Sequence, residues 1–294
     1  MIAETQPAPR GNRLAALFSL AVSLALLVAV AWQFRDLDLA KARALLPASS
    51  VFWLAFTGYY LAGPVSEWLV YRRLWNMPVA GIGALLRKLV ANELLLGYLG
   101  EAQFYAWARA RGNLTDTPFA AIKDMTILSA LVGNGATLVM LGLAWPYVSA
   151  GELGIQGTTV FAPLGAVLLT SLGIVLFRNR LFTLPRRELM FISAVHLARI
   201  VAILIFSAVM WHAVLPAVAL TLWLVLATLR MLISRLPLMP NKDVVFAGLT
   251  VLLLGKGADV AALMALMAVL LLAAHLVVGT IFGLMGLSEA EKVR

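Results

Sequence analysis

Charged and polar side chains interrupt two apolar stretches of this chain, and their chemistry suits the binding of an anionic group. The first stretch reads NELLLGYLGEAQFYAWARARG and begins at Asn92, and the second reads RLPLMPNKDVVFAGLTVLLLG and begins at Arg235. A guanidinium group holds a phosphate with a planar fork of donors, and an ammonium group acts as a point charge. We select as substrate-binding candidates Arg87, Glu101, Arg199, Arg230, Arg235 and Lys242, and as secondary candidates His196, Gln103, Lys88 and Asn92.

The alternative reading of these basic residues is structural. Long basic side chains at helix ends extend to the membrane surface, and Arg87, Lys88, Arg109 and Arg111 fit this role as well as a functional one. Glu101 and Lys242 follow apolar residues, and no helix end obviously needs them, which favours function. A charged side chain in the membrane core costs about 2.5–3.5 kcal/mol on insertion scales, so we expect it to have a partner or a role.

Two histidines lie inside expected spans. His196 and Arg199 are three residues apart, so they share one face of a helix and can share a partner. A substrate or gating role and a structural pair with Glu67 or another carboxylate are both open. His275 stands alone on an apolar face, which is typical of a hydrogen bond between helices.

Motifs for metal, cofactor or enzyme chemistry are sparse. The chain has no cysteine and three widely separated histidines, so we expect no metal site and no cofactor. It has no P-loop, no H-E-x-x-H and no G-x-S-x-G motif, and we do not expect an enzyme. One alternative is a membrane glycosyltransferase for polyprenyl-phosphate sugars that would use Asp36 and Asp38. Another is a non-catalytic partner in a lipid-synthesis complex.

Composition determines the class of protein that must position these residues. Of 294 residues, 62% are hydrophobic and 13% are charged, and the mean hydropathy is +0.94. Soluble domains have about 25% charged residues, so this chain is predicted to be an all-α polytopic membrane protein. The net charge of +9 fits the excess of basic residues in cytoplasmic loops, and we expect no nucleic acid partner.

The apolar runs predict about six full membrane spans within one integral membrane domain, residues 1–294. The expected spans are Leu14–Phe34, Val51–Tyr71, Ala121–Ser149, Thr158–Phe177, Leu189–Trp211 and Asp259–Gly286. A polar cytoplasmic tail, residues 1–13, precedes them. Two broken segments, Ile82–Gly112 and Ala213–Gly255, fit no simple span and are predicted to be re-entrant helical hairpins. In a rival arrangement, Ala213–Ser234 would cross the membrane completely.

An offset of 143 residues aligns the two halves of the chain. It places Arg87 on Arg230, Gly112 on Gly255 and Asp116 on Asp259. These residue types are much less common here than leucine, so the matches indicate two repeats, residues 14–150 and 157–294. Each repeat would cross the membrane three times, and an odd number of crossings inverts the second repeat relative to the first.

The distribution of basic residues predicts the orientation. Arg72, Arg73, Arg109 and Arg111 and the basic residues between 178 and 187 fall on one side, whereas the expected loops 145–157 and 211–216 have no Lys or Arg. Cytoplasmic loops are enriched in Lys and Arg. We therefore expect a protein of the bacterial cytoplasmic (inner) membrane with both termini in the cytoplasm.

The two broken segments resemble the motifs of the flippase-like membrane domain of lysylphosphatidylglycerol synthases and their stand-alone relatives. Asn92, Gly97 and Gly100-Glu101 match the first motif, and Pro237-Leu238-Met239-Pro240 matches the start of the second. Leu96 stands where the family commonly has proline, Asn241-Lys242 replace its Gly-Gly, and Phe246 replaces its Glu. The resemblance covers nearly the whole chain.

This resemblance implies a lipid translocase. It would move an anionic phospholipid or a polyprenyl-phosphate lipid across the membrane through a cationic cavity, in which Glu101 gates or balances charge. The family's soluble synthase domain would follow the membrane domain, and the chain ends shortly after its last expected span, so we expect no synthase activity. The expected partners are a membrane lipid with an anionic headgroup and either a second copy of the chain or a lipid-synthesis enzyme.

Overall fold

The computed structural model describes residues 47–95, 99–110, 118–149, 165, 169, 173, 181–235, 242–254 and 259–291. Its elements in these ranges are helices, and no strand occurs among them. They are α3 (Ser50–Trp75), η1 (Val79–Gly81), α4 (Ile82–Leu94), α5 (Leu99–Ala110), α6 (Pro118–Ser149), α9 (Arg186–Val214), α10 (Leu220–Ser234), α11 (Lys242–Leu254) and α12 (Asp259–Glu291). The prediction of an all-helical chain is confirmed for this part of the molecule.

Three of these helices are long and apolar enough to cross a membrane. They are α6 over Pro118–Tyr147, α9 over Arg186–Val214 and α12 over Ala262–Phe282. Helix α3 has 26 residues and contains the expected span Val51–Tyr71, although Glu67, Arg72 and Arg73 make it more polar. The expected span Leu14–Phe34 lies outside the described residues, and Thr158–Phe177 is described at only three positions. The protein is therefore a helical membrane protein.

Both broken segments form pairs of short helices. Helices α4 and α5 have 13 and 12 residues, and α10 and α11 have 15 and 13. A helix rises about 1.5 Å per residue, so each is about 18–23 Å long, which is less than the roughly 30 Å core of a bilayer. Within each pair the two helices pack against each other. None of these four helices is long enough to cross the membrane by itself.

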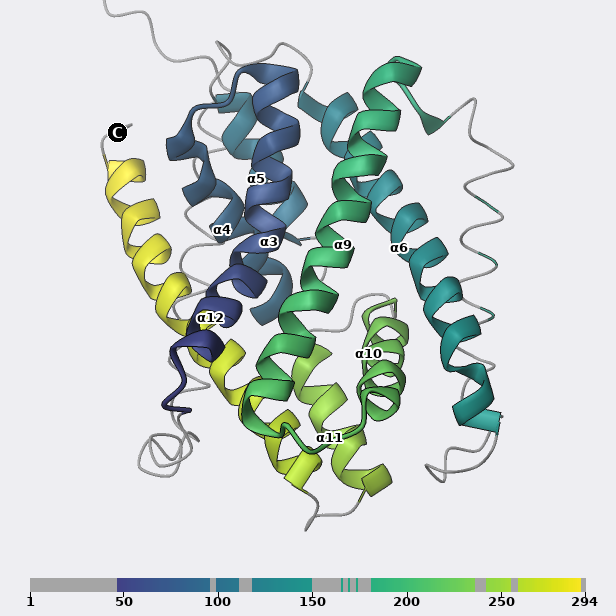
Figure 1. The fold of residues 1–294 in the computed structure, drawn as a ribbon. Coiled ribbons are helices and arrows are strands. Elements are labelled where there is room, and N and C mark those ends of the chain that lie inside the picture. The colour runs from purple at the N-terminus through teal and green to yellow at the C-terminus, as the bar shows by residue number, and fades with distance from the viewer. Residues whose placement is uncertain are drawn as a thin grey trace, which may run out of the picture.

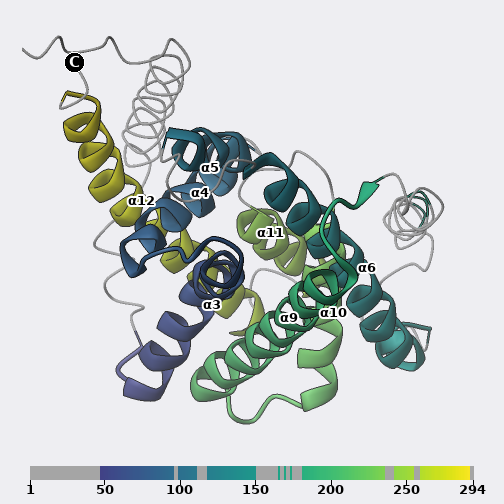
Figure 2. The same cartoon turned by 90° about the horizontal axis from the view of Figure 1, so that it is seen from above.

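The two pairs lie toward opposite ends of the bundle (Figure 1). Helix α3 runs upward in this view, and α4 and α5 lie in the upper half beside it. Helix α9 runs downward, α10 and α11 lie in the lower half, and α12 returns upward. Seen from above, α4 and α5 lie between α12 and α6, and both neighbours contact the pair (Figure 2).

Each pair of short helices has its own apolar core. The core around α4 and α5 contains Tyr71, Trp75, Phe104 and Ile192, with ring centroids of Tyr71 and Phe104 4.8 Å apart. The core around α10 and α11 contains residues of α3, α9, α10, α11 and α12, among them Trp211 and Trp223, whose ring centroids are 5.4 Å apart. Burial of large aromatic rings stabilises this packing, so both pairs are fixed parts of the bundle.

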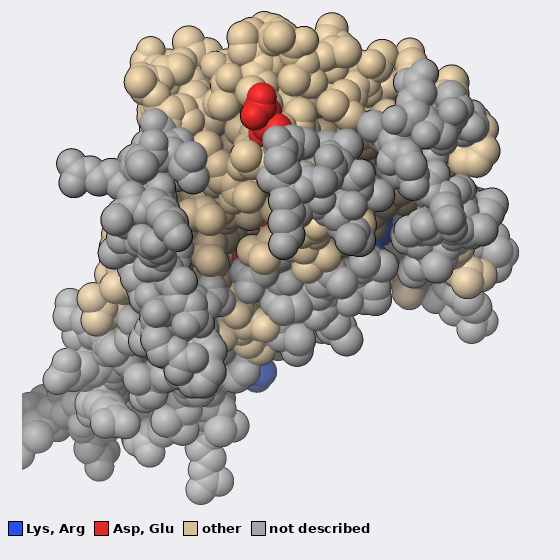
Figure 3. Space-filling view, turned by 90° about the horizontal axis from the view of Figure 1, so that it is seen from below, with Lys and Arg blue, Asp and Glu red and all other residues tan. Residues whose placement is uncertain are grey.

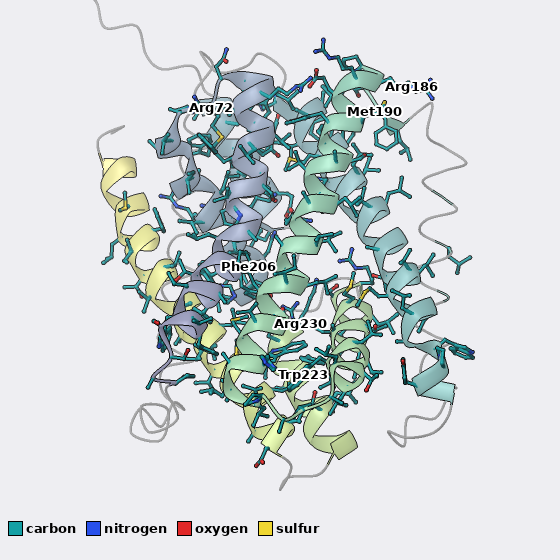
Figure 4. The ribbon with its side chains drawn as sticks, in the orientation of Figure 1. Arg72, Arg186, Met190, Phe206, Trp223 and Arg230 are labelled. Atoms are coloured by element: carbon teal, nitrogen blue, oxygen red, sulfur yellow. The ribbon has the colours of Figure 1, made fainter. Side chains whose placement is uncertain are left out.

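Basic residues gather at the upper end of the bundle. Arg72 and Arg186 lie there (Figure 4), and Arg73 donates two hydrogen bonds to Glu188 across α3 and α9, at 2.7 and 2.9 Å. At the lower end the described residues are almost all uncharged (Figure 3), and the loop 215–219 has no Lys or Arg. This asymmetry agrees with the charge pattern on which the predicted orientation rests.

Candidate functional site

Buried and half-buried charged side chains form two groups inside the bundle, and α4 contributes to both. The first, which we call the Lys88 cluster, consists of Glu67 on α3, Lys88 on α4 and Glu101 on α5. The second, the Arg230 cluster, consists of Arg230 on α10, Lys242 and Asp243 on α11, and Glu93 on α4. Buried charges are retained where they are paired and hydrogen-bonded, so we describe the pairing in each cluster first.

Lys88 joins two carboxylates from neighbouring helices. Its Nζ atom lies 2.8 and 2.9 Å from the two carboxylate oxygens of Glu67 and 3.4 Å from Oε1 of Glu101. Lys88 is only 5% exposed. Glu101 lies in the first turn of α5, where the free N–H groups of the helix end also favour a negative charge. The Lys88 ammonium group therefore holds α3, α4 and α5 together.

Arg199 and His196 lie close to the Lys88 cluster on α9. The Nη2 atom of Arg199 donates to Oγ of Ser129 on α6 at 2.9 Å, and Glu67 is the carboxylate whose charge acts on Arg199. His196 is fully buried, and neither of its ring nitrogens has a hydrogen-bond partner among the described residues. The charge of Glu67 acts on Arg199, and the charge of Arg199 acts in turn on His196.

Arg230 forms the centre of the second cluster. Its Nε and Nη2 atoms lie 2.8 and 2.7 Å from Oδ1 of Asp243, so the pair connects α10 to α11. Nη2 also donates to the hydroxyl group of Tyr59 on α3, and the guanidinium carbon lies 5.1 Å from the centre of that ring. Three helices therefore meet at one guanidinium group, which lies in the lower half of the bundle (Figure 4).

Lys242 and Arg235 lie at the break between α10 and α11. Lys242 donates to the backbone carbonyl of Ser234 at 3.1 Å, and Arg235 donates to Oγ of Ser234 at 3.0 and 3.1 Å. A cation is favourable beside the unpaired carbonyls of a helix C-terminus. The Arg235 guanidinium also occupies the space over Gly133 on α6. Both basic residues thus contact the end of α10.

The remaining sequence candidates line the break between α4 and α5. Asn92 accepts a hydrogen bond from the backbone N–H of Gly100 at 2.7 Å, which satisfies one of the free donors at the start of α5. Arg87 and Gln103 are buried on α4 and α5. Asn92 and Gly100 of the first motif therefore hold the break together, and Glu101 places its carboxylate beside Lys88.

The close approach at Gly100 gives a prediction. A Cβ atom at this position would overlap the carbonyl oxygen of Lys88 and the side chain of Asn92. We expect Gly100→Ala to lower the free energy of unfolding by about 1–3 kcal/mol, the usual range for overpacking. Reversible unfolding in mixed micelles measures it. Gly142→Ala on α6 is the matched control, because nothing lies within 4 Å of its new methyl group. Equal stability of the two variants would contradict the close packing of α4 on α5.

The cavities beside the Arg230 cluster are small. One of about 20 Å³ is lined by residues that include Tyr59, Arg230 and Asp243. Another of about 10 Å³ is lined by residues that include Glu93, Asp243 and His275. A volume of roughly 10–15 Å³ holds one water molecule. Neither of these two cavities can take a lipid headgroup in this structure.

From the sequence, the cations and Glu101 are selected as site residues, whereas Glu93 and Asp243 are noted only as further charges of the two broken segments. Glu67 was expected only as a partner of Arg199, whereas its hydrogen bonds go to Lys88. Glu93, Asp243 and Tyr59 were not selected as site residues. The signal that could have found them is the rarity of acidic residues, 14 in the chain, because a carboxylate inside an apolar segment needs a cation.

Other expected features bear less on the site. Among the residues described here, no group of three or more His, Cys, Asp and Glu side chains is arranged to hold a metal ion. Asp36 and Asp38, the residues of the transferase alternative, lie outside the described ranges. His275 shares a hydrogen bond with Tyr60, with 3.1 Å between Nδ1 and the hydroxyl oxygen.

Comparison with known proteins adds no further assignment. The chain matches no protein-family model, no curated protein and no solved structure. The geometry of the two clusters is therefore the basis for a proposal about function.

Proposed function

We propose that this protein is a lipid translocase, which moves a lipid with an anionic phosphate-bearing headgroup between the leaflets of the bacterial inner membrane. The observation that carries the proposal is the meeting of the two broken segments. Glu93 near the end of α4 and Asp243 at the start of α11 line the same small cavity. Helices that break inside a membrane and present charged groups are typical of transporter binding sites.

The positions of the helices support an inverted repeat. Adding 143 to the bounds of α5 gives residues 242–253, and α11 spans Lys242–Leu254. Adding 143 to the bounds of α6 gives 261–292, and α12 spans Asp259–Glu291. Two repeats of opposite orientation would bring α4–α5 and α10–α11 into the membrane from opposite faces. Such pairs of repeats allow a central site to open to either side in turn.

Arg230 and Lys88 are the cations that we propose to bind the phosphate when the bundle opens. In the structure each is satisfied by carboxylates, Asp243 for Arg230 and Glu67 with Glu101 for Lys88. A phosphate group offers the same charge-assisted hydrogen bonds as a carboxylate and can replace it. The paired state then corresponds to a closed protein without substrate. When the lipid binds, its phosphate takes the place of these carboxylates at Arg230 and Lys88. The resemblance of the two broken segments to flippase-like domains supports the same reading.

A leaflet-reversal assay with purified protein in lipid vesicles tests the proposal. Reporter lipids carry a fluorophore on the hydrocarbon tail, and a membrane-impermeant reductant quenches only those in the outer leaflet. We expect faster exchange of phosphatidylglycerol and of a polyprenyl phosphate than in protein-free vesicles. Phosphatidylcholine, a zwitterionic lipid, serves as the control lipid. Diacylglycerol is unsuitable as a control because it crosses the membrane without a protein. If no lipid class exchanges faster with protein present, the proposal is wrong.

A further inference from the structure

We propose that the small cavity between α4, α11 and α12 is a proton-binding site, that Glu93 is the group which takes up the proton, and that this site couples lipid movement to proton movement. The proton site stands on the geometry of the cavity alone. Its coupling to lipid movement rests on the proposed function. The two statements are tested by separate measurements below.

Glu93 and Asp243 face each other in different surroundings. Asp243 lies in the first turn of α11, where a helix end favours negative charge, and it is paired with Arg230. Glu93 lies in the last turn of α4, where a helix end disfavours negative charge. Within the described ranges Glu93 has no hydrogen bond or ion pair, although the charges of Asp243 and Lys242 act on it. Two neighbouring carboxylates in one apolar site rarely ionise together, and here Glu93 is the one left to hold a proton.

The other polar groups around the cavity can carry the proton. His275 of α12 lines the cavity with Glu93 and Asp243, and its Nδ1 atom lies 3.1 Å from the hydroxyl group of Tyr60 on α3. The cavity volume of about 10 Å³ suffices for roughly one water molecule. The charge of Lys242 also acts on Glu93, but the hydrogen bond of Lys242 goes to the carbonyl of Ser234. A chain from Glu93 through His275 to Tyr60 therefore reaches from one broken segment to α3.

Protonation of Glu93 changes the charge at the point where the two broken segments meet. With Glu93 neutral, Arg230 and Asp243 form a balanced pair and the junction between α4 and α11 is closed. Loss of the proton places a second negative charge beside Asp243. The ionised Glu93 then competes with Asp243 for Arg230 and Lys242. Repulsion between the two carboxylates then favours separation of α4 from α11, which exposes Arg230 to a phosphate. Each cycle takes one proton from one side of the membrane and releases it on the other.

Infrared spectroscopy of the full chain in lipid nanodiscs tests the proton site directly. We expect a carbonyl stretching band from a protonated carboxyl group that disappears as the pH is raised. Glu93→Gln should remove this band, and Glu93→Asp should retain it because the carboxyl group remains. Glu188→Gln is the control, since this carboxylate pairs with Arg73 at the upper end of the bundle, away from the cavity. A band that persists in Glu93→Gln, or no such band in the wild type, overturns the proton site.

Lipid distribution in vesicles tests the coupling. The membrane potential is clamped at zero, and a difference of about one pH unit is set across the vesicle membrane. If one proton moves with each lipid, phosphatidylglycerol becomes enriched about tenfold in one leaflet. We expect this enrichment in the wild type and an even distribution with Glu93→Gln. Even distribution in a wild type that moves lipid overturns the coupling. If the wild type moves no lipid, the coupling and the proposed function both fail, whereas the infrared result still decides the proton site.

Discussion

Replacement of Lys88 by methionine is expected to lower the free energy of unfolding by about 3–5 kcal/mol, the range for removing one partner of a buried ion pair. Methionine retains the length of the side chain but leaves Glu67 and Glu101 without the ammonium group that both contact. The loss is large because two carboxylates from α3 and α5 would then lie close together in a protein interior. Reversible unfolding in mixed micelles gives the free energy.

Two further variants separate this effect from a general loss of charge. Arg73→Met removes an ion pair of similar geometry between α3 and α9, but Arg73 is more exposed than Lys88. The free energy of unfolding should therefore change little. Lys88→Met combined with Glu67→Gln and Glu101→Gln removes the unpaired carboxylates and should recover most of the lost stability. A Lys88→Met protein as stable as the wild type would show that Lys88 does not hold the three helices together.

Replacement of Arg230 by glutamine is expected to slow lipid exchange by about 10- to 100-fold. A hydrogen bond to a charged group contributes about 1.5–3 kcal/mol, and each 1.4 kcal/mol corresponds to a factor of ten. Glutamine retains hydrogen-bonding groups but has no positive charge for a phosphate. Arg230→Lys should lie between the two, because lysine keeps the charge and loses the planar fork. The leaflet-reversal rate of phosphatidylglycerol measures the effect.

The Arg230 experiment needs two controls. One tests whether the variant is still folded, and the other tests whether loss of an arginine elsewhere in the bundle also slows lipid exchange. Asp243→Asn in the Arg230→Gln background removes the carboxylate that would otherwise be left unpaired, so a slow rate in this double variant reflects loss of the cation. Arg72→Gln is the positional control, because Arg72 is exposed at the upper end of α3 and outside both clusters. Wild-type exchange in Arg230→Gln, or equal slowing in Arg72→Gln, would exclude Arg230 as the phosphate-binding residue.

Much of the helical architecture follows from the sequence. The spans expected at Val51–Tyr71, Ala121–Ser149, Leu189–Trp211 and Asp259–Gly286 lie within helices α3, α6, α9 and α12. They were predictable because a helix in a membrane needs a continuous apolar run, which composition alone reveals. The break between α4 and α5 was also visible, as glycines and polar residues interrupt the run there.

The pairing of charges could not be predicted in the same way. Lys88 and Glu67 are 21 positions apart on different helices, and their distance depends on how α3 packs against α4. Lys242 looked functional because no helix end near it was evident, yet the end of α10 at Ser234 accepts its hydrogen bond. Sequence patterns indicate which faces of a helix are polar, whereas partners across helices are set by packing in three dimensions.

In the proposed function, two helical hairpins enter the membrane from opposite faces and meet around the Lys88 and Arg230 clusters. Site-directed labelling tests it most directly, since the chain has no cysteine of its own. Single cysteines would replace the exposed residues Val79 and Ala110, which flank α4–α5, and Ala217 and Asp259, which flank α10–α11. A membrane-impermeant thiol reagent should label the first two from one side only and the last two from the opposite side only. If the two members of either pair are labelled from different sides, that segment crosses the membrane completely, which contradicts the proposed re-entrant hairpins.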